Sequence, residues 1–309
     1  MHIASMRRGA SASNESPMHG LLRHFTGSGP VLTDGAWGTQ LAARGLPPGN
    51  CPDAWNLSRP DAVEEVARAY VEAGSQIILT NTFRANRIAL AGTELADRCA
   101  AINRAGVEIS RRAAGGKAAV FASMGPSGKL LLTGEVTFDE LRDAFQEQAS
   151  SLAAAGAEGL VVETMADARE ARAAIEAART TGLAVIGCMV FDSGKLHDRT
   201  LMGDTPEVVA RKLTEAGADA IGANCGQGVE QYVEVCGRLR DATDLPIWIK
   251  PNAGLPEIVD GEVRYRTTPA DFAAAAERLV DAGANFVGGC CGTNPEFVAA
   301  LRSRLHARQ

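Results

Sequence analysis

The sequence lacks the features that bind a chain to a lipid bilayer or to nucleic acid. No apolar stretch reaches the roughly 18 residues that a membrane-spanning helix needs. No run of Lys and Arg occurs, no basic stripe is interleaved with aromatic residues, and acidic side chains outnumber basic ones by 37 to 31. We therefore expect neither a membrane nor a nucleic acid as a partner.

The N-terminus also lacks the apolar segment of a secretory signal peptide. Residues 1–20 are mostly small or polar, and we expect them to form a disordered extension. The following residues, 21–309, are numerous enough to bury a large core, since 46% of the 309 residues are apolar. A single domain is predicted over this range.

A disulfide framework is absent as well. The seven cysteines are odd in number and unevenly spread, and the adjacent pair Cys290 and Cys291 would bridge only with strain. This distribution is typical of a reducing compartment. We therefore expect a cytoplasmic protein whose thiols are buried, catalytic or metal-bound.

Four segments of the chain share one repeated pattern. Each contains an Ala-Gly pair, a small residue, a short apolar run and then a polar or thiol residue. The distance from the glycine to that last residue is always seven positions: Gly74 to Asn81, Gly156 to Glu163, Gly217 to Asn224, and Gly283 to Cys290. The pattern predicts a helix that ends at a left-handed glycine and leads into a strand buried on both faces.

Helical patterns precede each of the four Ala-Gly pairs, and three of them begin with a capping signal at Pro60-Asp61, Thr205-Pro206 or Thr268-Pro269. Four further apolar strands are predicted, at 31–35, 118–126, 183–191 and 245–254. Eight strands separated by helices over about 260 residues predict a (β/α)8 TIM barrel. An open doubly wound sheet is disfavoured, because TDGAWGTQ lacks the GxGxxG order expected after its first strand.

In a barrel of this kind the chemistry lies at the carboxyl ends of the strands. The predicted strand ends are polar or small, and three of the seven cysteines fall on two of them. The candidate site residues at these ends are Asp34, Asn81, Glu163, Asn224, Cys225, Asn252, Cys290 and Cys291.

The cysteines at the strand ends form a candidate metal site. Cys225, Cys290 and Cys291 are expected to meet, because all strand ends converge on one barrel mouth. Three thiolates suit zinc, and three protein ligands with an open fourth position are typical of a catalytic site. The glycines beside the pair, at 288, 289 and 292, allow both side chains to turn toward one ion. The alternative interpretation of each cysteine is a small buried apolar side chain.

Five motifs, GGCCGT, NCG, PNAGLP, DGAWGT and TNTFRAN, together resemble the homocysteine S-methyltransferase family. This family includes the zinc-dependent homocysteine-binding domain of cobalamin-dependent methionine synthase, and betaine–homocysteine methyltransferase. The resemblance runs from about Val31 to Leu305. The segments SMGPSGKLL, VVETMADAREA and KPNAGLP are more similar to the methionine-synthase branch.

The resemblance implies a (β/α)8 barrel with one zinc ion per chain held by Cys225, Cys290 and Cys291. It also implies that Asp34 and Glu163 hold the amino group of homocysteine. From the residues alone, Asp34 is as typical of a turn, and Glu163 of a salt bridge across the barrel mouth.

The three strand-end asparagines are secondary candidates. Asn81, Asn224 and Asn252 either hold the substrate carboxylate or shape the loops around the mouth.

The activity that the resemblance implies is methyl transfer to the thiolate of homocysteine, giving methionine. A free alkyl thiol has a pKa of about 8.5, and binding to zinc would deprotonate it. The sequence leaves the donor open. Candidates are betaine, S-methylmethionine, S-adenosylmethionine, or methylcobalamin or methyltetrahydrofolate carried by a separate corrinoid or folate-linked protein.

Two alternatives lie outside methyl transfer. The first is a barrel lyase or aldolase that uses Lys250 as a Schiff-base nucleophile, since WIKPN places this lysine on a predicted strand. The second is a non-catalytic protein that binds zinc or thiols.

Overall fold

The computed structural model describes residues 19–259 and 262–306. Most of the predicted N-terminal extension, residues 1–18, lies outside the described residues, so this prediction stays untested. His19 and Gly20 already belong to the beginning of a helix, α1 (Gly20–Thr26), whose first turn is capped by the imidazole Nδ1 of His19.

Eight parallel strands form a barrel, as the sequence predicts. Their order is β1-β10-β7-β6-β5-β4-β3-β2, and a parallel bridge between Thr33 and Ile77 joins the first strand to the last. The strands are β1 (Val31–Leu32), β2 (Ile77–Ile78), β3 (Ala119–Met124), β4 (Gly159–Met165), β5 (Ala184–Met189), β6 (Ala220–Cys225), β7 (Ile247–Pro251) and β10 (Phe286–Val287).

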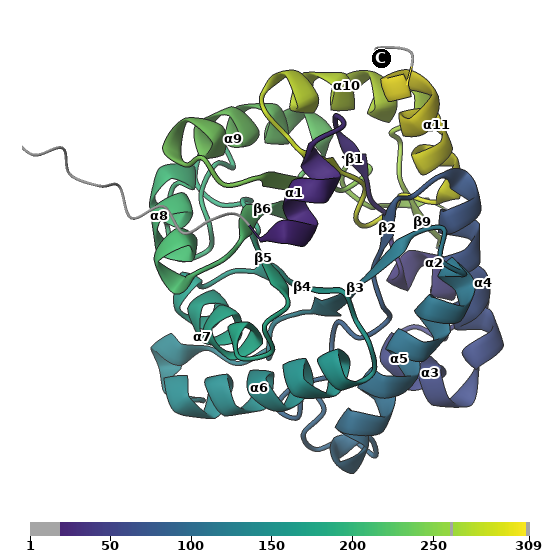
Figure 1. Cartoon of the computed structure of the whole chain (residues 1–309), viewed down its shortest axis with the longest axis vertical. Coiled ribbons are helices and arrows are strands. Elements are labelled where there is room, and N and C mark those ends of the chain that lie inside the picture. The colour runs from purple at the N-terminus through teal and green to yellow at the C-terminus, as the bar shows by residue number, and fades with distance from the viewer. Residues whose placement is uncertain (1–18, 260–261, 307–309) are drawn as a thin grey trace, which may run out of the picture.

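Helices surround the barrel on the outside (Figure 1). The longer ones are α4 (Pro60–Ala73), α5 (Cys99–Ala114), α6 (Phe138–Ala154), α7 (Ala168–Arg179), α8 (Pro206–Ala216), α9 (Val229–Ala242), α10 (Pro269–Asp281) and α11 (Pro295–His306). Short helical segments in the connections are α2 (Gly38–Ala42), η1 (Pro52–Ala54), α3 (Trp55–Ser58), η2 (Ala96–Arg98) and η3 (Leu131–Thr133). Among the described residues, no helix combines the length and the apolar character needed to cross a membrane.

The repeated Ala-Gly pattern has the predicted conformation. Gly74, Gly156, Gly217 and Gly283 have φ angles of 92–109°, in the left-handed region that ends a helix without a Cβ clash. The side-chain oxygens of Thr205 and Thr268 accept hydrogen bonds from the first turns of α8 and α10. Each of the four strands therefore begins at a fixed distance from its glycine. The residue seven positions after each glycine lies at the carboxyl end of the barrel.

Large apolar side chains fill the inside of the barrel. Phe121 and Trp248 stack with ring centroids 6.2 Å apart, and Trp248 contacts Phe286 at 5.0 Å. Helix α1 lies across the amino ends of the strands (Figure 1), where its Leu22 is fully buried against the same cluster. The amino end of the barrel is thus closed, and any site has to lie at the other end.

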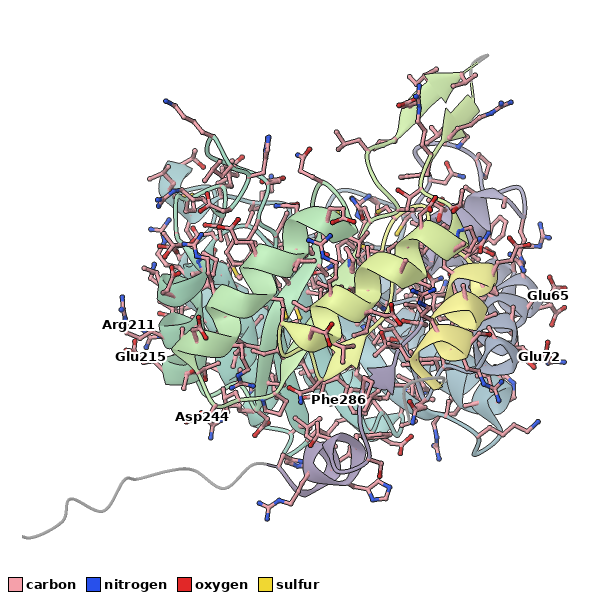
Figure 2. The ribbon with its side chains drawn as sticks, turned by 90° about the horizontal axis from the view of Figure 1, so that it is seen from above. Glu65, Glu72, Arg211, Glu215, Asp244 and Phe286 are labelled. Carbon is pink, nitrogen blue, oxygen red and sulfur yellow. The ribbon has the colours of Figure 1, made fainter. Side chains whose placement is uncertain are left out.

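A two-stranded hairpin projects from the carboxyl end of the barrel, opposite α1 (Figure 2). It consists of β8 (Glu257–Val259) and β9 (Glu262–Arg264), which pair in antiparallel fashion after β7. The sequence analysis did not predict this hairpin. Its Ile258 is 81% exposed, so the strands have no core-facing side that would give a clear hydrophobic pattern.

Candidate metal centre

The three candidate metal ligands meet at the carboxyl end of the barrel. Cys225 is the last residue of β6, and Cys290 and Cys291 follow β10. Their sulfur atoms all lie within 4.8 Å of one another. Zinc–sulfur bonds of about 2.3 Å in a tetrahedron place the sulfurs about 3.8 Å apart, so the three thiols fit a zinc ion with small adjustments.

The thiols already share protons in a way that suits metal binding. Hydrogen bonds from Cys290 and Cys291 lower the pKa of Cys225 to about 3. The same contacts raise the pKa of Cys290 well above its usual range and that of Cys291 to about 11. Contact with the other two thiols thus favours the thiolate form of Cys225, and a divalent cation would take the place of the remaining thiol protons.

The backbone around the cysteines is held in an unusual conformation. Cys225 has a φ angle of 69°, which is rare for a residue with a side chain. On the other side, the amide of Cys290 donates to the carbonyl of Pro251 at 2.8 Å. A Cβ on Gly288 would lie 2.0 Å from Thr33 Oγ1, so only glycine lets the chain leading to the pair pass this close to β1.

Two of the three candidate asparagines contact the thiol cluster. The amide nitrogen of Asn252 donates to the sulfur of Cys225 at 3.5 Å, and that of Asn224 lies 3.9 Å from the sulfur of Cys290. Asn224 also bonds to both the amide and the hydroxyl of Thr164, at 2.7 and 2.6 Å. The amide nitrogens of these two asparagines thus lie against two of the three sulfur atoms, and their predicted roles in substrate binding or loop shaping stay predictions.

Asn81 lies away from the sulfur atoms. Its amide nitrogen donates to the carbonyl of Pro52 at 2.8 Å and to the side chain of Asn56 at 2.9 Å. Asn81 lines the cavity described below, but its amide hydrogens are used to hold the loop around η1.

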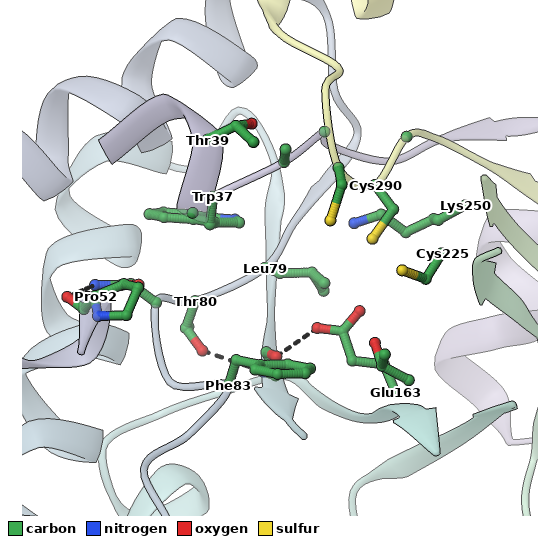
Figure 3. Close-up of a pocket in the computed structure, with 18 of the residues that line it drawn as sticks. Trp37, Thr39, Pro52, Leu79, Thr80, Phe83, Glu163, Cys225, Lys250 and Cys290 are labelled. Carbon is green, nitrogen blue, oxygen red and sulfur yellow. Dashed lines mark hydrogen bonds between the residues drawn. The ribbon is translucent and has the colours of Figure 1, made fainter. Parts of the chain in front are cut away.

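A cavity of about 350 Å³ opens beside the thiol cluster. The residues that line it include the three cysteines, Glu163, Thr164 and Lys250, together with Trp37, Pro52, Asp53, Phe83 and Arg84. Figure 3 shows Trp37 and Pro52 on the side of the cavity away from Cys225 and Lys250. A small molecule bound in it would therefore contact sulfur, a carboxylate and an ammonium group at the same time.

Glu163 presents a carboxylate to this cavity. The side chain is only 8% exposed, and its Oε1 accepts a hydrogen bond from the hydroxyl of Ser123 at 2.5 Å. Burial raises the pKa of Glu163, although Lys250 and Ser123 act in the opposite direction. A buried carboxylate of this kind gains most from a ligand that brings a positive charge.

Asp34 is fully buried and pairs with a lysine. Its Oδ1 accepts a hydrogen bond from Lys250 Nζ, and its Oδ2 accepts from Trp37 Nε1 and the amide of Leu79, both at 2.8 Å. Burial by itself lowers the pKa of Lys250, but Asp34 and then Glu163 raise it above its usual value. The ion pair with Asp34 favours the ammonium form of Lys250, whereas a Schiff-base nucleophile must be a free amine.

Four further residues that line the cavity were not among the predicted site residues. Asp53 is 1% exposed, accepts a hydrogen bond from the amide of Arg84 at 2.9 Å, and has its pKa raised by burial to about 6. Phe83 and Arg84 lie within TNTFRAN, so the motif that carried the resemblance also contained cavity residues. Trp37 likewise follows directly on Asp34 in the motif DGAWGT.

The fold and the site together define a class of protein. The chain is a (β/α)8 barrel with three thiols at its strand ends that could hold a metal ion. Comparison with known proteins narrows this class. The profile of the family described as Homocysteine S-methyltransferase matches residues 31–305, so the chain belongs to the homocysteine S-methyltransferase family. The resemblance seen in the sequence motifs is thereby confirmed.

Individual relatives agree with this assignment. Over 293 residues the chain is 33% identical to the methionine synthase of Mycobacterium tuberculosis and 32% identical to that of Mycobacterium leprae. These matches cover 89% of this chain and 24% of each relative, so the chain spans about a quarter of their length.

Solved structures also match. The metallated form of the homocysteine methyltransferase MmuM from Escherichia coli superimposes with a TM-score of 0.77 at 25% identity. That match covers 94% of this chain and all of the MmuM chain. A putative phosphonomutase from Burkholderia cenocepacia, at 17% identity and a TM-score of 0.51, shares the fold alone.

Proposed function

We propose that the protein is a metal-dependent homocysteine S-methyltransferase that converts homocysteine to methionine. The observation that carries this proposal is the cluster of Cys225, Cys290 and Cys291, whose sulfurs lie within 4.8 Å of one another beside a cavity of amino-acid size. Membership of the homocysteine S-methyltransferase family supports homocysteine as the acceptor.

The metal is proposed to be one zinc ion per chain, held by these three cysteines. Bound there, zinc would supply a Lewis acid that favours the thiolate form of the incoming homocysteine. The all-sulfur donor set supports zinc over magnesium or calcium, which prefer oxygen ligands. The free state of all seven cysteines suits a reducing, cytoplasmic setting.

The protein side chains then orient the acceptor. Glu163 is proposed to bind the substrate ammonium, because its buried carboxylate lines the cavity with one hydroxyl partner and would be further stabilised by an incoming cation. Asn224 and Asn252 keep the ligand sulfurs in place through their amide hydrogens.

The methyl donor is proposed to be a methylated corrinoid. The support is the greater similarity to methionine synthases, at 32–33% identity, than to MmuM, at 25%. A small donor such as betaine, S-methylmethionine or S-adenosylmethionine is the competing candidate.

A donor screen tests both parts of the proposal. Each reaction contains zinc-loaded protein, homocysteine and one candidate donor. The donors are methylcobalamin, methyltetrahydrofolate, S-methylmethionine, betaine and S-adenosylmethionine, and methionine is measured by mass spectrometry. We expect methionine with methylcobalamin. Turnover with a small donor alone would overturn the corrinoid assignment, and a lack of methionine with every donor would contradict the activity itself.

A further inference from the structure

The adjacent residues Cys290 and Cys291 begin a tight turn at the carboxyl end of the barrel. The carbonyl of Cys290 accepts hydrogen bonds from the amide of Thr293 at 3.1 Å and from its hydroxyl at 2.8 Å. The third residue of the turn, Gly292, has a left-handed φ of 81°. A positive φ at this position is typical of a type II turn and favours glycine. The conformation of the turn sets the directions in which the two neighbouring sulfurs point.

An aromatic ring lies directly against this turn. A Cβ on Gly292 would lie 2.3 Å from Cγ of Tyr265 and 2.4 Å from its Cδ1. The ring therefore occupies the space that any side chain at position 292 would need. Tyr265 directly follows β9 and also packs against the largest cluster of buried apolar side chains, so the ring is held in place from behind.

The residues that follow β7 contact the thiol cluster at two further points. The amide of Ala253 donates to the carbonyl of Cys291 at 2.9 Å, and the amide nitrogen of Asn252 donates to the sulfur of Cys225 at 3.5 Å. With Tyr265, segments on both sides of the β8–β9 hairpin thus contact candidate ligands from β6 and from the stretch after β10.

Tyr265 lies outside the cavity that would hold the acceptor. Cys291 lines this cavity, whereas Gly292 and Tyr265 are not among the described residues that do so. No hydrogen bond to the hydroxyl of Tyr265 is present within the described part of the chain, so its contact with the turn is made by the ring. A role in contact with the substrate is therefore not what this geometry supports.

We propose that Tyr265 is a positioning residue for the zinc site. Its ring holds the turn at Gly292 in the conformation that directs the sulfurs of Cys290 and Cys291 at one ion. This inference rests on the proposed function, because it assumes zinc at the three thiols. Removal of a group that orients metal ligands without touching the metal lowers metal affinity about 10- to 100-fold in other proteins.

The zinc affinity of Tyr265 variants tests the proposal, measured by competition with a chromophoric chelator on folded protein. Tyr265→Ala should bind zinc at least about 10-fold more weakly than the unaltered protein, whereas Tyr265→Phe keeps the ring and should stay within about threefold of it. Val263→Ala is the matched control, because Val263 lies two residues before Tyr265 and is 61% exposed. It should bind zinc as the unaltered protein does.

A double variant tests whether the ring acts through the turn. Gly292→Ala should weaken zinc binding, because the added Cβ meets the ring of Tyr265 and a φ of 81° is unfavourable for alanine. With Tyr265→Ala in the same chain the contact with the ring disappears, so the combined loss of affinity should be smaller than the product of the two single losses. Losses that simply multiply would show that the ring and the turn act separately, and would overturn the proposal.

Urea unfolding of the variants without zinc separates positioning from stability. A ring that only stabilised the fold would lower the unfolding midpoint of Tyr265→Ala and leave the zinc affinity of the folded protein unchanged. That result would overturn the inference and leave the proposed metal centre intact. If the unaltered protein itself bound no zinc, the metal centre would fail, and the inference would fail with it.

Discussion

At the scale of single residues, the site depends on three sulfur atoms from two barrel strands. Cys225 ends β6 with a left-handed φ of 69°, and the pair Cys290 and Cys291 follows β10 through Gly288 and Gly289. Asn224 and Asn252 direct amide hydrogens at two of the sulfurs. The proposed zinc ion would account for the convergence of these three thiols and for the left-handed φ of Cys225.

Cys290→Ser should remove the bound zinc, because a serine hydroxyl stays protonated at neutral pH and is a poor ligand for a borderline-soft cation. We expect metal analysis to give about one zinc per chain before the substitution and close to none after it. Cys51→Ser is the matched control, since Cys51 bonds to Asp53 and lies outside the cluster. A Cys290→Ser protein with undiminished zinc would remove this residue from the ligand set.

Asp53 should make the stability of the fold fall as the pH rises from about 4 to about 6. Burial raises its pKa from the ordinary 3.8 to about 6, so the folded state binds this proton more tightly than the unfolded chain does. Above pH 6 the ionised carboxylate costs about 3 kcal/mol. Asp53→Asn should therefore be more stable at pH 7 and close to the unaltered protein at pH 4, in urea titrations at both values. Equal effects at the two pH values would show that the charge of Asp53 is not responsible.

The strand-end cysteines could be predicted from the sequence because helix and strand patterns fix the register. The seven-residue offset from Gly283 to Cys290 equals the offset from Gly217 to Asn224, so Cys225 had to lie at the same barrel end. The pairing of Lys250 with Asp34 could not be predicted, because 216 positions separate the two residues and no local pattern links them. The roles of Asp34 and Glu163 in substrate binding stay predictions.

At the scale of helices and strands, local capping and turn chemistry define where each barrel strand begins. Thr205 and Thr268 cap α8 and α10, and glycines with positive φ end the helices before β2, β4, β6 and β10. Pro60 likewise occupies the first turn of α4, although Arg59 makes no side-chain capping bond there. These signals are local, which is why the order and type of the elements could be predicted.

Thr268→Ala should destabilise the protein by about 1 kcal/mol, since the amide of Asp271 loses its acceptor at the beginning of α10. Thr268→Ser retains the hydroxyl and should restore most of that free energy of unfolding. The measurement is the urea midpoint of both variants. If alanine and serine give the same midpoint, the hydroxyl does not stabilise α10.

Helix α1 and the β8–β9 hairpin are among the elements that the sequence patterns did not predict. Helix α1 has seven residues, too few for a clear periodic pattern, and its burial comes from contact with residues far along the chain. The hairpin strands have three residues each and project away from the barrel (Figure 2). Both elements are short, so local propensity and periodicity give little signal for them.

At the scale of the whole molecule, the two ends of the barrel have separate tasks. The amino end is closed by α1 and by the stacked rings of Phe121, Trp248 and Phe286, so it contributes stability. The carboxyl end carries the thiols and the cavity. This division predicts that stability and metal binding can be changed independently.

Leu22→Ala should lower the free energy of unfolding by about 3 kcal/mol, because it leaves a cavity under the barrel floor. Leu22 is fully buried, whereas its neighbour Leu21 is partly exposed, so Leu21→Ala should cost clearly less. Zinc content should stay the same in both variants, as measured on folded protein. Loss of zinc in folded Leu22→Ala protein would show that the two barrel ends are coupled.

The most direct test of the account is zinc K-edge X-ray absorption on the metal-loaded protein, with and without homocysteine. The account predicts three sulfur neighbours from Cys225, Cys290 and Cys291 in the free protein, and a fourth when homocysteine is added. A sulfur count that does not rise on addition of homocysteine, or a zinc bound mainly by nitrogen and oxygen, would contradict it.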